Sequence, residues 1–320
     1  MLPDHPTIAI VGAGAVGGYY GARLAQHRHD VHFLLRSDYD AIRRDGWTIR
    51  SIAGDFRLAP GQTQIYKDVR EMPRCDLVIV TLKTTANDQF ERIVGPLLKD
   101  DTAILTLQNG LGNEDRLAEL FGPQRVLGGL AFVCANRLAP GVIHHIDHGM
   151  IRVGEFGGGS SERASRIARI FQSSNVPCEM LDDLRCGRWS KLVWNVPFNG
   201  LGAVLNLTTD RLIDDPAGVQ LLSAIMREVI AAAEQLGMNM PADMVDRMMR
   251  HTQTMGAYRS SMQIDRQAAR PMEVEAILGE PLRQAAKAAV PTPCLEMLYR
   301  LVKLVDNHSP SALQADSSGR

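Results

Sequence analysis

Three polar side chains recur at intervals of four in the segment KLVWNVPFNG, which runs from Lys191 to Gly200. Residues spaced in this way stack on one face of a helix, so Lys191, Asn195 and Asn199 should form a stripe. Lysine can donate a proton to an oxygen that gains charge, and asparagine amides can hold a small polar ligand. An unpaired buried polar group costs free energy, so the stripe faces either a polar ligand or solvent. Spacing alone favours solvent.

Pro197 lies between the two asparagines of this stripe. Proline has no N–H, so the Val193 carbonyl loses its usual helical donor and a kink is expected. Trp194 and Phe198 fall on another face of the same helix, where they can enter an apolar core.

A second polar cluster lies in YRSSMQIDRQAARPMEVEAILG, some seventy residues later. It contains Ser260 and Ser261, then Asp265 and Arg270, which can form a structural ion pair. Glu273 follows in a predicted turn into a helix. Taken alone, it is predicted only as a first-turn carboxylate that the helix dipole favours.

A glycine turn, GxGxxG, follows a short apolar segment at Thr7–Val11 and opens a predicted helix. In this setting Gly12 allows the tight turn, Gly14 lets a pyrophosphate approach the backbone, and Gly17 allows close packing of helix and strand. The anion would bind the free N–H groups at the helix N-terminus. A purely structural turn is the alternative. The predicted cofactor-binding turn comprises Gly12, Ala13, Gly14, Ala15, Val16 and Gly17.

Polar residues also follow three predicted strands at the edge where ligands bind in such sheets. Arg36 stands where NAD-binding proteins usually place an acidic residue, and Lys83 ends VIVTLK. Both can contact a 2′-phosphate, so NADPH is favoured over NADH, although either can also be a solvated cation. Asn109 in LTLQNGLGNE follows another strand, and its Asn-Gly pair is also typical of a simple turn.

These residues require two kinds of scaffold. Apolar runs alternate with polar turns in the first part of the chain, which predicts a doubly wound α/β Rossmann-type domain over residues 1–182. Helices are expected near 88–98 and 113–120, and strands and hairpins over 125–155. Helical periodicity over 183–307 predicts an all-helical domain, and the polar tail 308–320 is expected to be disordered.

Composition excludes several classes of protein. A net charge of -1 is not typical of nucleic-acid binding, and five scattered cysteines without a CxxC pair favour neither disulfides nor a zinc site. His144, His145 and His148 lie in a predicted strand and are not expected to bind a metal. No signal peptide or membrane span is expected, so the protein is predicted to be cytoplasmic.

The motifs taken together resemble the ketopantoate reductase family (2-dehydropantoate 2-reductase). The resemblance rests on the glycine turn with Arg36, LKT, QNGLGN, KxxxNxxxN and SSMxxDxxxxRPxExExIxG, and it extends from Thr7 to about Val305. It implies NADPH-dependent reduction of 2-dehydropantoate to (R)-pantoate in a cleft between a Rossmann domain and a helical domain like that of 6-phosphogluconate dehydrogenase. A homodimer is also compatible with this family.

The resemblance implies a role for each of the candidate residues. Lys191 would protonate the ketone oxygen, and Glu273 would orient the lysine, the substrate and the cofactor. Asn195, Asn199 and Ser261 would bind the substrate, with Ser260 as the alternative to Ser261. Asn109 would contact both cofactor and substrate, while Arg36 and Lys83 would bind the 2′-phosphate.

Two positions depart from the family pattern. Pro197 can shift Asn199 relative to Lys191, and Thr209 stands where another substrate-contacting asparagine is expected, with Asn206 three residues earlier. Two alternatives therefore stay open. One is an NADPH-dependent reductase of another 2-keto acid. The other is a non-catalytic NADPH-sensing protein, which is disfavoured because Lys191 and Glu273 are both present.

Overall fold

The computed structural model describes residues 2–309, and the chain forms two compact units. The sheet unit comprises the residues up to Asn109 and Asn113–Leu184. The helical unit comprises Gly110–Gly112 and the chain from Arg185 onwards. The predicted fold class, a Rossmann-type α/β part followed by an all-helical part, is confirmed. The disorder predicted for the tail concerns mostly residues 310–320, which lie outside the described residues.

One large sheet forms the centre of the sheet unit, in the order β4-β3-β9-β8-β7-β6-β1-β2-β5. Strands β8, β7, β6, β1, β2 and β5 are mutually parallel, as in a doubly wound fold. The strands are β1 (Thr7–Val11), β2 (Asp30–Leu34), β3 (Trp47–Ser51), β4 (Phe56–Leu58), β5 (Gln64–Tyr66), β6 (Cys75–Val80), β7 (Leu98–Thr106), β8 (Val126–Ala139), β9 (Val142–Glu155) and β10 (Cys178–Leu181).

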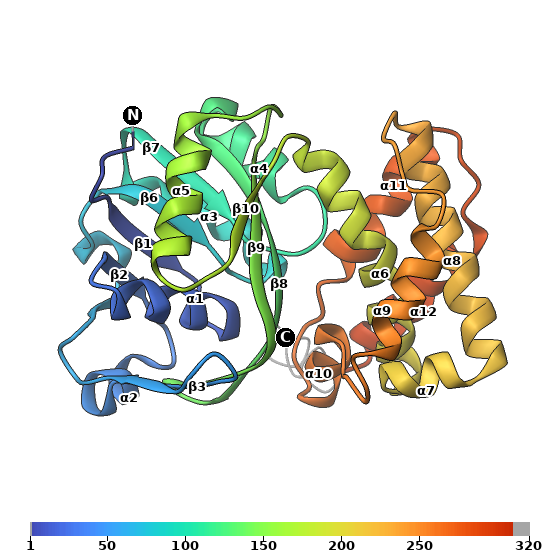
Figure 1. Ribbon diagram of the computed structural model, residues 1–320, viewed down its shortest axis with the longest axis horizontal. Coiled ribbons are helices and arrows are strands. Elements are labelled where there is room, and N and C mark those ends of the chain that lie inside the picture. The colour runs from blue at the N-terminus through green and yellow to red at the C-terminus, as the bar shows by residue number, and fades with distance from the viewer. Residues whose placement is uncertain (1, 310–320) are drawn as a thin grey trace, which may run out of the picture. The chain divides into compact units, whose positions relative to one another are not determined.

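Both faces of this sheet are covered by helices, which explains why its central strands are apolar throughout. Ile8 and Ile10 of β1 face a core shared with α1 (Ala15–Gln26) and α5 (Glu162–Ser173) (Figure 1). Ala9 and Val11 face the opposite core, which contains buried residues of α3 (Phe90–Val94) and α4 (Asn113–Phe121). Alternation along one strand therefore supplies two hydrophobic layers.

The predicted hairpin is present as two strands of 14 residues each, β8 and β9, which pair antiparallel. On the outer side of β9, β3 and β10 pair parallel to it at different heights, and β4 pairs antiparallel with β3. The parallel nucleotide-type sheet is thus extended on one side by mixed pairing.

The helix predicted near residues 88–98 is much shorter than expected. The segment consists of a 3₁₀ turn η2 (Thr84–Gln89), helix α3, a second 3₁₀ turn η3 (Gly95–Leu97) and the start of β7 at Leu98. Pro96 has no N–H to continue the hydrogen bonding of α3, and the chain passes into the 3₁₀ turn η3 instead. Three further short elements complete the sheet unit: α2 (Tyr39–Asp45), η1 (Val69–Glu71) and η4 (Pro123–Arg125).

The helical unit is built around one apolar core. Trp189, Val193 and Phe198 of α6 are almost fully buried in it. Most of the clustered methionines lie in or against this core, as core filling predicts. The helices are α6 (Leu184–Leu205), α7 (Thr209–Asp214), α8 (Pro216–Gln235), α9 (Met244–Gln253), α10 (Ser261–Gln267), the π-helix η5 (Glu275–Gly279), α11 (Glu280–Lys287) and α12 (Pro293–Asn307).

Helix α8 alone among the described helices has the length and apolar composition of a membrane span, contrary to the expectation that no segment has them. Of its most apolar stretch of 18 residues, 44% is buried inside the fold. Leu222, Met226 and Val229 belong to the apolar core, so packing within the helical unit accounts for much of this composition.

Candidate active site

The glycine turn lies between β1 and α1, where the sequence places it. Gly12 has a φ of 97°, and a Cβ there would lie 2.5 Å from the Leu82 nitrogen. A Cβ on Gly17 would lie 2.2 Å from the Thr81 hydroxyl, whereas a Cβ on Gly14 would meet nothing within 4 Å. The first and third glycines are therefore needed for the fold itself. The second leaves open space beside the backbone, as a bound pyrophosphate requires.

The N-terminus of α1 is suited to an anion. No side chain caps it, and its first turn contains no acidic residue. No capping side chain therefore competes with a bound anion for its N–H groups and the positive end of its dipole. The Thr81 hydroxyl, at the end of β6, donates to the Gly12 carbonyl at 2.7 Å and fixes the turn. The other residues of the predicted turn, Ala13, Ala15 and Val16, lie in the same segment.

The other predicted nucleotide contacts lie after the carboxyl ends of β2, β6 and β7. Arg36 is exposed two residues after β2, and Lys83 is exposed where η2 begins after β6. Asn109 lies three residues after β7, and its carbonyl accepts a bond from the Asn113 amide at 2.9 Å. Because β2, β1, β6 and β7 are parallel neighbours, these residues belong to the edge that carries Gly12.

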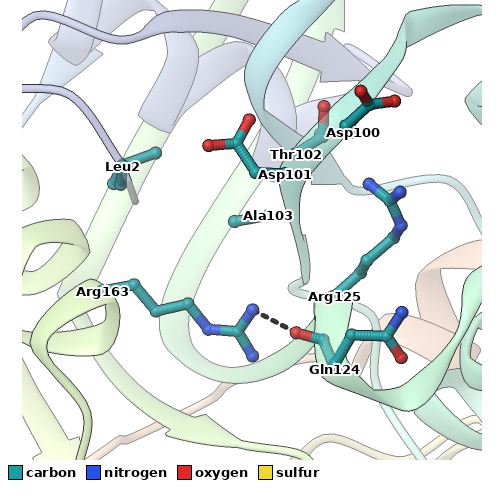
Figure 2. A pocket seen from close by; sticks show the side chains of 8 residues that line it. All are labelled: Leu2, Asp100, Asp101, Thr102, Ala103, Gln124, Arg125 and Arg163. Carbon is teal, nitrogen blue, oxygen red and sulfur yellow. Dashed lines mark hydrogen bonds between the residues drawn. The ribbon is translucent and has the colours of Figure 1, made fainter.

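A separate cavity of about 260 Å³ lies in the other half of the sheet unit. Its walls include Asp100–Ala103 in the amino-terminal half of β7, Arg125 of η4 and Arg163 of α5 (Figure 2). Arg163 donates to the Gln124 carbonyl and pairs with Glu155, so its charge is already compensated. None of the predicted site residues lines this cavity. The candidate nucleotide site is instead the edge of the sheet at which the parallel strands end.

In the helical unit, the polar stripe of α6 is largely buried, so the solvated face favoured by spacing alone is wrong. Asn195 is 7% exposed, Asn199 is 2% exposed and Lys191 is partly buried. Helix α6 continues through Pro197 for 22 residues in all. The stripe is buried because long-range packing in the helical unit covers this face, which the local pattern cannot reveal.

The environment of Lys191 favours its neutral form. Desolvation by burial, followed by the charge of Arg188, lowers the pKa of Lys191 to about 7, while Glu273 acts in the opposite direction. Arg188 is 4% exposed and lies on the same face of α6, about 60° round from Lys191 at 100° per residue. The sequence reasoning missed Arg188, although its i, i+3 spacing from Lys191 was a usable signal.

Asn199 holds the start of α10. Its side-chain oxygen accepts bonds from the Ser261 hydroxyl and the Met262 N–H, both at 3.1 Å. These two donors fix the amide so that its NH₂ group points away from α10. Ser260 caps the same helix through the Gln263 N–H. Ser261 is thus placed beside Asn199, while Ser260 is buried as a cap.

Asn195 is different from its neighbour, because its side chain has no hydrogen-bond partner among the described residues. The residue is 7% exposed, but its amide atoms are not sealed from solvent, so water or a ligand can reach them. It lies one turn from Lys191 on the same stripe. This combination indicates a place for a polar ligand rather than a structural role.

Glu273 is 7% exposed and directly precedes the helical segment that begins at Val274 and continues as the π-helix. It is close enough to Lys191 to raise the pKa of that group. The predicted ion pair between Asp265 and Arg270 is present at 3.0 Å and ties α10 to the segment leading to Glu273. The helical unit therefore brings Lys191, Glu273 and the two asparagines together.

No group of histidine, cysteine and acidic side chains among residues 2–309 has the arrangement of a metal site. His145 instead stacks on Tyr19 with ring centroids 4.3 Å apart and bonds the Ser51 hydroxyl. All five cysteines are free thiols.

Comparison with known proteins gives consistent matches over most of the chain. Residues 8–158 match the family model of ketopantoate reductase PanE/ApbA, and residues 183–306 match the model of its C-terminal domain. A 2-dehydropantoate 2-reductase of Nostoc sp. is 44% identical, covering 94% of this chain and 95% of the relative. A 2-dehydropantoate 2-reductase structure from Geobacter metallireducens is 45% identical, with a TM-score of 0.91 and coverage of 93% and 99%. D-mandelate dehydrogenase with NADH and anilino(oxo)acetate shares the fold at 22% identity, a TM-score of 0.85 and coverage of 94% and 98%.

Proposed function

Because this chain belongs to the ketopantoate reductase family, we propose that it catalyses the NADPH-dependent reduction of 2-dehydropantoate to (R)-pantoate. The chain is an oxidoreductase by this membership, and the choice of substrate follows the names of relatives that match along nearly their whole length.

The residues of the sheet unit fit a pyridine nucleotide. The open space at Gly14 and the uncapped N-terminus of α1 suit a pyrophosphate. Arg36 and Lys83 supply exposed positive charge where a ribose 2′-phosphate would lie. Because Arg36 occupies the position at which NAD-binding proteins usually have an acidic residue, NADPH is favoured over NADH. Asn109 would reach both ligands from the end of β7.

The residues of the helical unit fit the reduction of a ketone. The nicotinamide, when bound, supplies the hydride. Lys191 donates a proton to the ketone oxygen as charge develops there, and a pKa of about 7 suits this donor at neutral pH. Glu273 places the ammonium group. The NH₂ groups of Asn195 and Asn199 donate to oxygens of the substrate. The Ser261 hydroxyl, which donates to Asn199, accepts a bond from the substrate hydroxyl.

The observation that carries the proposal is the accessible amide of Asn195, which lies one turn from the desolvated amine of Lys191. Oxidation of NADPH measured with a panel of 2-keto acids tests it, with the variants Lys191→Ala and Glu273→Ala as controls. Turnover of 2-dehydropantoate that both variants abolish supports the proposal. Turnover of another keto acid alone would show that the substrate is wrong. Binding of NADPH without any turnover would favour a sensing protein.

The oligomeric state and the location in the cell are proposed as well. A homodimer, expected from the family resemblance, is tested by light scattering during size-exclusion chromatography. A cytoplasmic location, expected from the composition, is tested by fractionation of cells that express the tagged chain.

A further inference from the structure

Thr209 lies at the first position of α7 and is 2% exposed. Its hydroxyl donates a bond to the Gly256 carbonyl at 2.9 Å. The same hydroxyl accepts a bond from the Tyr258 N–H, with 3.2 Å between nitrogen and oxygen. Its own backbone N–H donates to the Tyr258 carbonyl at 2.9 Å. One buried residue therefore binds both ends of the exposed turn Gly256–Tyr258 through side chain and backbone.

This turn leads directly into the substrate-binding segment of the proposed site. Residues 254–260 connect α9 to α10 without regular secondary structure, and two residues after Tyr258 the chain reaches the Ser260 cap. A loop of this kind is mobile unless it is bonded to something rigid. Thr209 provides that bond from a helix packed against α8 and α9.

Hydrogen bonds from α6 also hold this segment on both sides of the Thr209 attachment. Upstream, the Trp194 indole N–H donates to the Thr252 hydroxyl at 2.9 Å. Downstream, Asn199 accepts from the Ser261 hydroxyl and the Met262 N–H. Trp194 and Asn199 both belong to α6, and the Trp194 ring also lies 6.3 Å from the Tyr258 ring, whereas Thr209 holds the turn from α7.

We propose that Thr209 is a positioning residue that holds the Gly256–Tyr258 turn and thereby keeps Ser261 against Asn199 in the keto acid site. The role of Thr209 rests on the proposed reduction of a keto acid. Thr209 itself reaches no substrate, because its hydroxyl is already engaged as donor and acceptor by the turn. Its effect is therefore expected on substrate affinity and not on the chemical step.

Thr209→Val tests this role because valine keeps the shape of threonine and lacks the hydroxyl. The net free energy of one hydrogen bond corresponds to about a three- to tenfold change in an equilibrium constant. Since the bond holds the substrate-binding segment, KM for the keto acid should rise by about this factor. kcat should change less than about twofold, and KM for NADPH should not change. Thr209→Ser should restore the wild-type KM. Thr254→Val is the matched control, since the Thr254 hydroxyl donates to the His251 carbonyl within its own helix end.

Hydrogen exchange separates this role from the proposed function as a whole. The amides of Tyr258 and Met262 should exchange faster in Thr209→Val than in the wild type and in Thr254→Val, whatever substrate the enzyme uses. If Thr209→Val lowers Tm too far for kinetics, Thr209→Ala and Thr209→Ser at lower temperature give the same comparison. Equal exchange and equal KM in Thr209→Val and Thr254→Val would overturn the proposal, as would a fall in kcat with KM unchanged. Faster exchange combined with absent turnover in the wild type would refute the reductase function and leave the positioning role standing.

Discussion

The pH dependence of the proposed reduction follows from the environment of Lys191. Burial and the Arg188 charge lower the pKa of Lys191 to about 7, so the protonated form that donates to the substrate is lost above this pH. A group with this pKa is about 90% protonated at pH 6 and about 1% protonated at pH 9. kcat/KM for 2-dehydropantoate should therefore fall about 90-fold between these pH values. An unperturbed lysine would give almost no fall over this range.

Two variants move the descending limb of this profile in opposite directions. Glu273 raises the pKa of Lys191, so Glu273→Gln should shift the limb to lower pH, whereas Arg188→Met should shift it to higher pH. The assay is the initial rate of NADPH oxidation at low substrate concentration across pH 6 to 9. A profile that stays flat to pH 9, or two variants that shift it in the same direction, would refute the assignment of Lys191 as the proton donor.

Four further predictions use other features of the structure. The free energy of unfolding should depend on pH through Lys191, whose pKa falls from 10.5 in the unfolded chain to about 7 in the folded protein. Burying the charged amine destabilises the fold fully below about pH 7, and this destabilisation disappears as the pH rises to 10.5. Lys191→Met should accordingly raise Tm more at pH 6 than at pH 10, and an equal gain at both would contradict this. Gly17→Ala should lower Tm because the added Cβ collides with the Thr81 hydroxyl. Gly14→Ala should leave Tm unchanged and weaken NADPH binding measured by calorimetry. A lower Tm in both variants would remove the argument for a pyrophosphate site at Gly14. Arg36→Ala should weaken NADPH about 10- to 100-fold and NADH little, and equal losses in fluorescence titrations would argue against a 2′-phosphate contact. Asn199→Ala should both raise KM and lower Tm by several degrees, because it leaves the Met262 N–H without its acceptor; an unchanged Tm would show that this bond does not stabilise α10.

The sequence was most informative where local pattern determines structure. The apolar run of β1, the glycine turn and the start of α1 are set by neighbouring residues, and each is present where predicted. The helical periodicity of α8, α9 and α12 was equally direct.

The burial of the α6 stripe could not be predicted from its own pattern. The side chain of Asn199 is held by Met262, 63 residues away, and no local signal connects the two. The same holds for Thr209, whose partners in the Gly256–Tyr258 turn lie 47 and 49 residues later. The sequence marked Thr209 only as a departure from a family pattern, and the structure shows the contacts that give it a role.

The most direct measurement of the central claim is the transfer of hydrogen from cofactor to substrate. The enzyme is incubated with 2-dehydropantoate and NADPH deuterated at the reactive position of the nicotinamide, and the product is analysed by mass spectrometry. The proposed function predicts pantoate that carries one deuterium at the former ketone carbon, and none with Lys191→Met under the same conditions. Unchanged 2-dehydropantoate after complete binding of the cofactor, or deuterium transfer only to a different 2-keto acid, would contradict it.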